Sequence, residues 1–164
     1  MGLIGISPII SPDLLVTLAR MGHGDSICFA DANFPSENLE SPGKRGPVTI
    51  RADGHEVAPL LRAVSKLFPL DSYTDFPVQM MAPVPGDELD PSIEARFAAA
   101  VEAEQPGTFK VERVERFAFY ERARSCYAVV ATGETAKYGN IILVKGVLSV
   151  SEGSDESGPA VFKL

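Results

Sequence analysis

A histidine and an aspartate stand on either side of one short apolar stretch near the N-terminus. His23 lies between Gly22 and Gly24, and Asp31 directly follows the stretch 26–30. The glycines leave room beside the imidazole for another molecule, and an imidazole can give and retake a proton near neutral pH. The stretch 26–30 is typical of a buried strand, and open α/β sheets commonly bind ligands at the carboxyl ends of their strands. The sequence therefore predicts a pocket with acid–base chemistry, for which His23 is the strongest candidate.

Six other polar or turn-forming residues are candidates for lining such a pocket: Asp71, Arg116, Tyr120, Tyr138, Gly139 and Asn140. Arg116 and Tyr120 are four residues apart on one face of a predicted helix, where they form either a hydrogen-bonding pair or an amphipathic pair that covers the core. Residues 138–140 lead into a strand-like stretch, and a simple turn explains them equally well. Asp71 lies in a connecting segment, where a surface acid is ordinary. Spacing alone does not choose between these readings.

No spacing in the chain predicts a metal site or a nucleotide cofactor. One conceivable set of metal ligands is His23, Asp25, Asp31 and His55. No HxH, HExxH or CxxC pattern in the sequence supports such a site. Dinucleotide and phosphate-loop fingerprints are also missing, as is the GxSxG elbow of an acyl-transfer enzyme. We therefore expect neither metal nor cofactor. Asp25 is expected to hydrogen-bond the loop that holds His23, and His55 to be a surface or capping residue.

The composition argues for a single soluble domain that works in the cytoplasm. The chain has 164 residues, is 45% hydrophobic and carries a formal charge of −7, which argues against nucleic acid or an anionic membrane as the main partner. No apolar run approaches the roughly 18 residues of a membrane span, and the N-terminus lacks the pattern of a signal peptide. Cys28 and Cys126 lie in apolar stretches and are expected to be buried thiols.

The order of helix-like and strand-like stretches predicts an α/β fold with a central sheet flanked by helices. Residues 1–150 form the expected domain, and a polar tail follows at 151–164, in which Val161 and Phe162 are candidates for docking on a neighbouring surface. We expect the last two strands to pair at the centre of the sheet. The expected helices are 12–21, 56–68, 92–104 and 115–124, and the expected strands are 26–30, 48–51, 78–82, 109–114, 126–131 and 140–144.

Seven blocks, in order, resemble the fucose mutarotase and ribose pyranase family, also described as RbsD/FucU-like. They are Ser-Pro-Asp-Leu-Leu at 11, Arg-Met-Gly-His-Gly-Asp at 20, Asp-Ala-Asn-Phe-Pro at 31, Ile-Arg-Ala-Asp-Gly at 50, Leu-Asp-Ser-Tyr at 70, Glu-Arg-Phe-Ala-Phe-Tyr-Glu-Arg-Ala at 115 and Ala-Thr-Gly-Glu-Thr-Ala-Lys-Tyr-Gly-Asn-Ile-Ile-Leu at 131. The block at 115 and the Tyr-Gly-Asn form are similar to the fucose branch, whereas ribose pyranases tend to Tyr-Ala-Asn. The tail departs from the family's usual end just past the last strand.

The resemblance implies an isomerase that interconverts the α and β anomers of free L-fucose without a cofactor, with His23 as general acid. It implies that Asp31 binds or orients sugar hydroxyls and that Asp71 has a site role, and that Arg116, Tyr120 and residues 138–140 line the sugar site. The general base stays open between Asp31, a tyrosine and water.

The resemblance also implies an α/β subunit that assembles into rings, commonly decamers of two stacked pentamers, with the pocket near a subunit boundary. Two alternatives remain: a D-ribose pyranase, and a monosaccharide-binding module without turnover.

Overall fold

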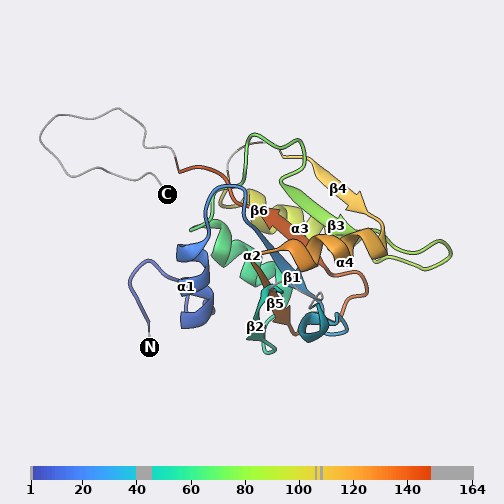
Figure 1. Ribbon diagram of the computed structural model, residues 1–164, viewed down its shortest axis with the longest axis horizontal. Helices are drawn as coiled ribbons and strands as arrows, with labels where there is room; N and C mark the ends of the chain where they lie inside the picture. Colours follow the sequence, from blue (N-terminus) through green and yellow to red (C-terminus); the bar gives the residue numbers. More distant parts are fainter. Residues whose placement is uncertain (1, 40–45, 106, 108, 149–164) are drawn as a thin grey trace, which may run out of the picture.

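The computed structural model describes residues 2–39, 46–105, 107 and 109–148, and contains one mixed sheet of six strands (Figure 1). The strands lie in the order β2-β5-β1-β6-β3-β4. Their bounds are Ser26–Ala30 for β1, Val48–Ala52 for β2, Val78–Met81 for β3, Val111–Val114 for β4, Ala128–Thr132 for β5 and Ile141–Val144 for β6. All six expected strands form, with ends within two residues of those predicted.

Five of the six strands run in the same direction. β6 is antiparallel to both of its neighbours, β1 and β3, whereas β2, β5 and β1 pair in parallel, as do β3 and β4. The carboxyl ends of five strands therefore share one edge of the sheet with the start of β6. We call this the carboxyl edge, and the opposite one, where β6 ends, the amino edge.

The expectation that the last two strands pair with each other is wrong. β1 lies between them, with Ile27 paired to Ala128 of β5 and to Leu143 of β6. Four of the five β1 residues are buried, so β1 needs cover on both faces and a partner on both sides. The segment between β5 and β6 crosses over the end of β1 instead of making a hairpin.

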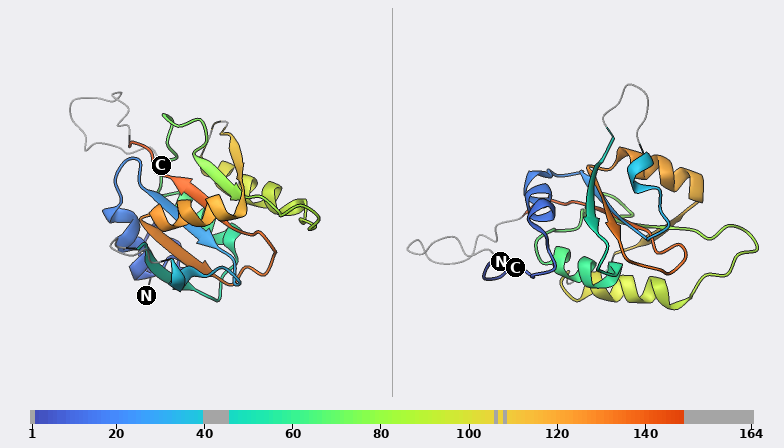
Figure 2. Two further views of the ribbon diagram at one scale, coloured as in Figure 1. Left: turned by 45° about the vertical axis from the view of Figure 1, so that its right-hand side comes forward. Right: turned by 90° about the horizontal axis from the view of Figure 1, so that it is seen from below.

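Helices cover both faces of the sheet. α2, Val57–Ser65, and α3, Ser92–Glu102, pack together below one face in the right-hand view of Figure 2, and α4, Arg116–Ser125, lies on the other. α1, Pro12–Arg20, adds its apolar side to the core on the α2 and α3 face. Ile27 and Phe29 point into that core, whereas Cys28 and Ala30 point toward α4, as the alternation of a strand requires.

Local signals set the helix ends. The Ser11 hydroxyl accepts the Leu14 N–H at the start of α1, and the Glu115 carboxylate accepts the Phe117 N–H at the start of α4. α2 ends at Ser65, three residues before the predicted end, and the Gln105 side chain amide donates to the Ser65 and Phe68 carbonyls. A side chain from beyond α3 thus closes the end of α2.

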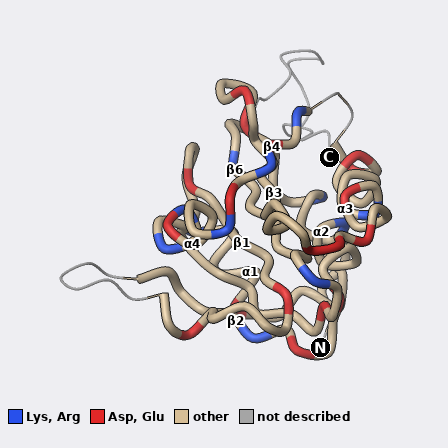
Figure 3. Tube along the Cα trace, turned by 90° about the vertical axis from the view of Figure 1, so that its right-hand side faces the viewer, with Lys and Arg blue, Asp and Glu red and all other residues tan. Residues whose placement is uncertain are grey.

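The two cysteines are buried free thiols, as predicted. Burial raises the pKa of the Cys126 thiol to about 11, so it stays protonated near neutral pH. Within the described ranges, no helix has the length and apolar character to cross a membrane. Acidic and basic positions are interspersed along helices and connecting segments (Figure 3). The expectations for the tail at 151–164 fall outside the described residues.

Candidate functional site

Asp31 and Asn140 form a reciprocal pair of hydrogen bonds at the carboxyl edge. The Asn140 Nδ2 donates to Asp31 Oδ2 at 2.6 Å, and the Asp31 backbone N–H donates to Asn140 Oδ1 at 2.9 Å. Asp31 directly follows β1 and Asn140 directly precedes β6, so the antiparallel pairing of these strands places the two residues side by side. Both residues are buried, and the other carboxylate oxygen accepts the Asn33 N–H at 2.9 Å.

The Asp31 carboxyl is harder to ionise than an ordinary aspartate. Burial raises its pKa most, and hydrogen bonds from Asn33, Asn140 and Phe34 oppose that shift without cancelling it, while the nearby Glu134 carboxylate raises the pKa further. A carboxyl group with a raised pKa is better matched to accepting a proton near neutral pH than an ordinary one. Asp31 thus has the surroundings of a candidate base as well as those of a hydrogen-bonding ligand.

A cavity of about 180 Å³ opens beside this pair. Five of the eight residues singled out from the sequence line it: Asp31, Arg116, Tyr120, Tyr138 and Asn140. Gly139 lies behind them, where an added Cβ would come within 2.8 Å of Glu134 Cγ and 2.9 Å of the Ala136 carbonyl oxygen. The fold therefore brings together residues from three separate parts of the chain, and position 139 has no room for a side chain.

Tyr138 reaches the cavity from a left-handed backbone conformation, with φ of 60°. Its hydroxyl donates to Asp87 Oδ2 at 2.7 Å and accepts the Val84 N–H at 3.4 Å. The Tyr138 hydroxyl and the Lys137 ammonium lower the pKa of Asp87, so this carboxylate stays charged. A non-glycine residue keeps a positive φ only when its surroundings stabilise that conformation. The hydrogen bond to Asp87 contributes to this stabilisation.

Sequence reasoning missed Asp87 and Lys137, which also line the cavity. Asp87 lies between β3 and α3, in a segment that the sequence marks only as acidic and rich in turns. The dipeptide Gly86-Asp87, with Gly86 at φ 87°, signals a turn. Nothing in it signals a contact with a tyrosine about fifty residues later.

Arg116 brings a buried hydrogen-bond donor to the same cavity. Its Nε has no hydrogen-bond partner among the residues that the structure describes, and its Cζ lies 4.9 Å from the centroid of the Phe117 ring. The Tyr120 ring packs 5.3 Å from Phe34 and 6.4 Å from Phe117, measured between centroids. The Arg116 guanidinium gives the cavity a positive charge and hydrogen-bond donors that suit oxygen atoms, and the aromatic rings offer an apolar wall next to it.

His23 and Asp71 form a second constellation, at the amino edge. The His23 Nε2 lies 3.1 Å from Asp71 Oδ1, and its ring packs edge-on against Tyr73 with centroids 5.4 Å apart. Gly24 takes φ of 82°, and the Gly22 N–H donates to Asp25 Oδ2 at 2.7 Å, which confirms the predicted role of Asp25 in this loop. The His23 side chain is 49% exposed, so one side of the imidazole is open.

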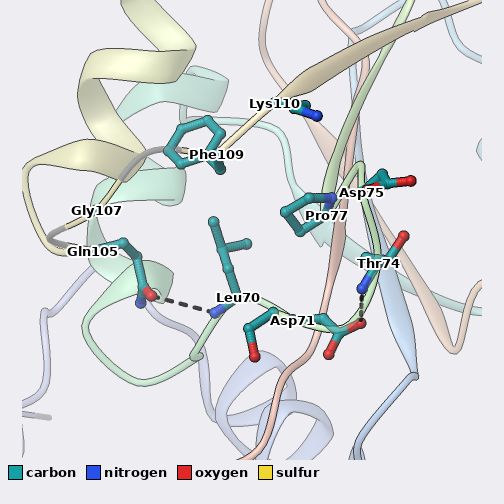
Figure 4. Close-up of a pocket in the computed structure, with 10 residues that line it drawn as sticks. Leu70, Asp71, Thr74, Asp75, Pro77, Gln105, Gly107, Phe109 and Lys110 are labelled. Atoms are coloured by element: carbon teal, nitrogen blue, oxygen red, sulfur yellow. Dashed lines mark hydrogen bonds between the residues drawn. The ribbon is translucent and has the colours of Figure 1, made fainter.

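Asp71 is the fixed member of this second pair. Its carboxylate accepts the Thr74 N–H at 3.1 Å (Figure 4) and also the Tyr73 N–H at 3.3 Å. Burial raises its pKa, but these two bonds and the one from His23 outweigh burial, so the net pKa is lowered. The ionised carboxylate can hold the imidazole in one orientation.

The two constellations lie at opposite ends of β1. Its five residues span about 15 Å at roughly 3.3 Å per residue, which is longer than one monosaccharide. His23 and Asp71 are therefore not joined with the carboxyl-edge residues inside one copy of the chain. The sequence placed His23 and Asp31 on either side of one strand correctly, but the expectation of a single pocket holding both does not hold for one copy.

His55 lies apart from both constellations. Its backbone carbonyl accepts the Gly133 N–H at 2.8 Å, and its N–H donates to the Ala52 carbonyl at 3.0 Å, just before α2. It thus has a structural place at a turn. Across the described part of the chain, no group of three or more His, Cys, Asp and Glu residues is placed to hold a metal ion.

The chain is similar to known proteins over most of its length. The sequence model of the RbsD / FucU transport protein family matches residues 4–148. A curated L-fucose mutarotase of Actinobacillus pleuropneumoniae serotype 5b (strain L20) is 56% identical over 146 residues, which are 89% of this chain and 97% of that protein.

Two solved structures share the fold over nearly their whole length. The fucose mutarotase from Streptococcus pneumoniae, in complex with L-fucose, is 44% identical with a TM-score of 0.81, over 90% of this chain and all of the other. FucU from Bifidobacterium longum is 42% identical, also with a TM-score of 0.81, over 88% and 99%. The chain belongs to the RbsD / FucU transport protein family.

Proposed function

We propose that this chain is an L-fucose mutarotase, an isomerase that interconverts the α and β anomers of free L-fucose. The relatives named fucose mutarotase support this. The observation that carries the proposal is the cavity at the carboxyl edge, where Asp31, Asn140 and Arg116 gather beside aromatic rings. Amide, carboxylate and guanidinium groups suit the hydroxyls of a sugar, and an aromatic face suits its apolar side.

Mutarotation requires two proton transfers and no net change in the sugar. A base takes the proton from the anomeric hydroxyl while an acid protonates the ring oxygen, and the ring C–O bond breaks to give the open-chain aldehyde. After the carbonyl group turns, the ring oxygen attacks its other face and both protons return. We assign the base role to Asp31, because its raised pKa suits proton exchange near neutral pH, and the acid role to His23.

A second copy of the chain completes the site in this proposal. One copy holds Asp31 and His23 at opposite edges of the sheet, and neither His23 nor Asp71 lines its cavity of about 180 Å³. Placing the amino edge of a neighbour over the cavity brings in its His23, already oriented by Asp71.

Exposed aromatic side chains support that contact. Tyr73 beside His23 is 79% exposed, and Phe117 beside the cavity is 64% exposed. A contact between two different patches is head-to-tail, and it closes into a ring when the rotation allows. We propose a ring of this kind, with a decamer as its expected form, and we propose the cytoplasm as its compartment because both buried thiols are free.

One-dimensional NMR saturation transfer on L-fucose tests the proposal. Purified protein should speed the exchange between the α and β anomer signals well above that of sugar in buffer alone. A binding module without turnover would raise the melting temperature in the presence of L-fucose but leave the exchange at the buffer rate. D-ribose, followed through its pyranose and furanose signals, is the matched substrate: faster turnover of ribose than of fucose would contradict the assignment.

A further inference from the structure

Glu134 is a buried acid that the reaction above does not use. Its side chain is 4% exposed. One carboxylate oxygen, Oε1, accepts the Ala136 N–H at 3.1 Å, whereas the buried Oε2 has no hydrogen-bond partner among the described residues. A buried carboxylate oxygen without a partner is costly, so its position calls for a physical reason.

Glu134 packs next to the cavity residues, at the carboxyl end of β5. An added Cβ at Gly139 would lie 2.8 Å from Glu134 Cγ and 3.7 Å from Asp31 Cβ, so both acidic side chains contact the same glycine. The Ala32 N–H also donates to the Glu134 carbonyl at 2.8 Å, which ties the segment after β1 to the segment after β5. The Glu134 charge is thereby fixed close to Asp31.

Arg96 compensates this charge only in part. Its Nη2 lies 3.7 Å from Glu134 Oε2, too far for a hydrogen bond, and 3.2 Å from Oε2 of Glu56. Arg96 belongs to α3 and its side chain is 40% exposed. One half-solvated cation is thus shared between a buried and an exposed carboxylate.

We propose that Glu134 is a positioning residue for anomer exchange: its buried negative charge tunes Asp31 as a proton acceptor, and Arg96 limits that effect. The proposal rests on the proposed function for its kinetic consequence. If Glu134 only filled space, a neutral side chain of the same shape could replace it. In this proposal such a side chain could not, because the negative charge is what acts on Asp31.

The electrostatics of Asp31 support the proposal. Burial raises the pKa of Asp31 most, and the Glu134 carboxylate raises it further, because two nearby carboxylates resist being ionised together.

Other charged groups face Asp31 across its two neighbouring cavities: Arg116, Asp87 and Lys137 on one side, and Glu37, Arg51 and Asp53 on the other. The Cys28 thiol behind it is kept neutral by burial, which raises its pKa. The Lys137, Arg51, Asp53 and Glu37 side chains are all more than half exposed, so solvent and salt screen them far more than Glu134.

Two substitutions should move the pH dependence of anomer exchange in opposite directions. Because Asp31 must be ionised to accept a proton, the rate falls as pH drops through its pKa. Glu134→Gln removes the repelling charge, so this acid limb should move to lower pH. Arg96→Gln leaves the Glu134 charge uncompensated, so the limb should move to higher pH. A purely structural role would lower the rate at every pH or move both variants the same way, and either result overturns the proposal.

Glu104→Gln is the matched control, because it removes a carboxylate just past the end of α3 that pairs with Arg62 and Lys66 and not with Arg96. Its acid limb should coincide with that of the parent protein.

Carbon-13 NMR of sedimented, aspartate-labelled protein gives a readout that needs no turnover. The Asp31 carboxyl signal, assigned through its loss in Asp31→Asn, should titrate at lower pH in Glu134→Gln and at higher pH in Arg96→Gln. Equal midpoints in all three proteins would refute the coupling. If the parent protein does not speed anomer exchange, the proposed function fails, and these midpoints still decide whether Glu134 tunes Asp31.

Discussion

The His23 imidazole contacts Asp71 and Tyr73 and leaves one side open to solvent. In His23→Gln the amide can still donate to Asp71 but cannot release a proton near neutral pH. We expect anomer exchange to fall by about 10²- to 10⁴-fold, the usual contribution of a positioned acid, with a free energy of unfolding within about 0.5 kcal/mol of the parent. Saturation transfer and denaturant unfolding measure the two quantities.

His55→Gln is the control for that substitution, since His55 is the other histidine of the chain and lies at a turn outside both constellations. It should keep the parent rate. A His23→Gln protein that exchanged the anomers as fast as the parent would show that another group supplies the proton.

We expect Asp87 to act through Tyr138, whose hydroxyl donates to its carboxylate. In Asp87→Asn the acceptor of the Tyr138 hydroxyl loses its charge, and charge-assisted hydrogen bonds are roughly twice as strong as neutral ones. The ring should therefore be held less firmly at its left-handed backbone, and we expect KM for L-fucose to rise about 3- to 10-fold with a smaller change in kcat. The concentration dependence of the exchange rate separates the two.

Asp90→Asn provides the comparison, because Asp90 is in the same segment but caps the Ser92 N–H at the start of α3 and does not line the cavity. A similar rise of KM in both variants would mean that the whole segment had loosened and that the Tyr138 contact has no particular role.

Residue types and spacing singled out His23 and Asp31, because glycine context and position at strand ends are visible in one sequence. The Tyr-Gly-Asn turn became a candidate through the family resemblance, since its spacing fits a simple turn equally well. Asp87 and Glu134 were missed for a physical reason. Each matters through a contact with a residue whose neighbourhood only the fold creates: Asp87 with Tyr138, and Glu134 with Asp31 across Gly139. An orphaned carboxylate oxygen is likewise invisible until burial is known.

At the scale of helices and strands, hydrophobic periodicity located each described α-helix and strand to within a few residues, but it did not predict the short 3₁₀ helix Ser36–Asn38. It failed for the neighbours of β1, since a fully apolar strand shows that it is buried on both faces but not which strands flank it. Placing β1 between β5 and β6 is what sets Asp31 beside Asn140. The geometry of the candidate site therefore depends on the strand order around β1, which hydrophobic periodicity could not predict.

The turn between β5 and β6 is held by close packing at Gly139, which can be tested by overfilling it. Gly139→Ala would place a methyl group 2.9 Å from the Ala136 carbonyl oxygen and against Glu134, so the turn must shift. We expect a loss of about 1 to 3 kcal/mol in the free energy of unfolding, as for other overpacked sites, and reduced exchange because Asn140 moves away from Asp31. Denaturant unfolding and saturation transfer are the measurements.

Gly54→Ala is the matched change, since an added Cβ there meets no atom within 4 Å. It should leave the free energy of unfolding within about 0.5 kcal/mol of the parent. If both alanine variants behaved alike, the tight packing at position 139 would not be what fixes the turn.

At the scale of the whole molecule, the parallel direction of five strands separates the two constellations. Asp31, Arg116, Tyr138 and Asn140 gather where these strands end, and His23 is held by Asp71 where they begin. Each edge carries an exposed aromatic side chain next to its polar group, Phe117 at one and Tyr73 at the other. In our proposal, these two incomplete and different halves form a complete site only when copies meet head to tail.

Mixing two inactive variants tests this arrangement directly. His23→Gln keeps the Asp31 cavity but lacks the acid, and Asp31→Asn keeps the acid but lacks the base. When the two are unfolded together in equal amounts and refolded, about a quarter of the head-to-tail contacts should join an intact cavity to an intact His23. Anomer exchange should then recover to about a quarter of the parent rate, because each such contact is a complete site.

A double variant carrying His23→Gln and Asp31→Asn is the control, since neither single variant can complete a site with it, and its mixtures should stay inactive. Differently tagged copies show whether mixed assemblies form at all. If mixed assemblies form and the exchange does not recover, His23 and Asp31 must serve the same copy or separate purposes. Recovery in the mixed assemblies can arise only from sites shared between copies, because no single chain in them holds both residues.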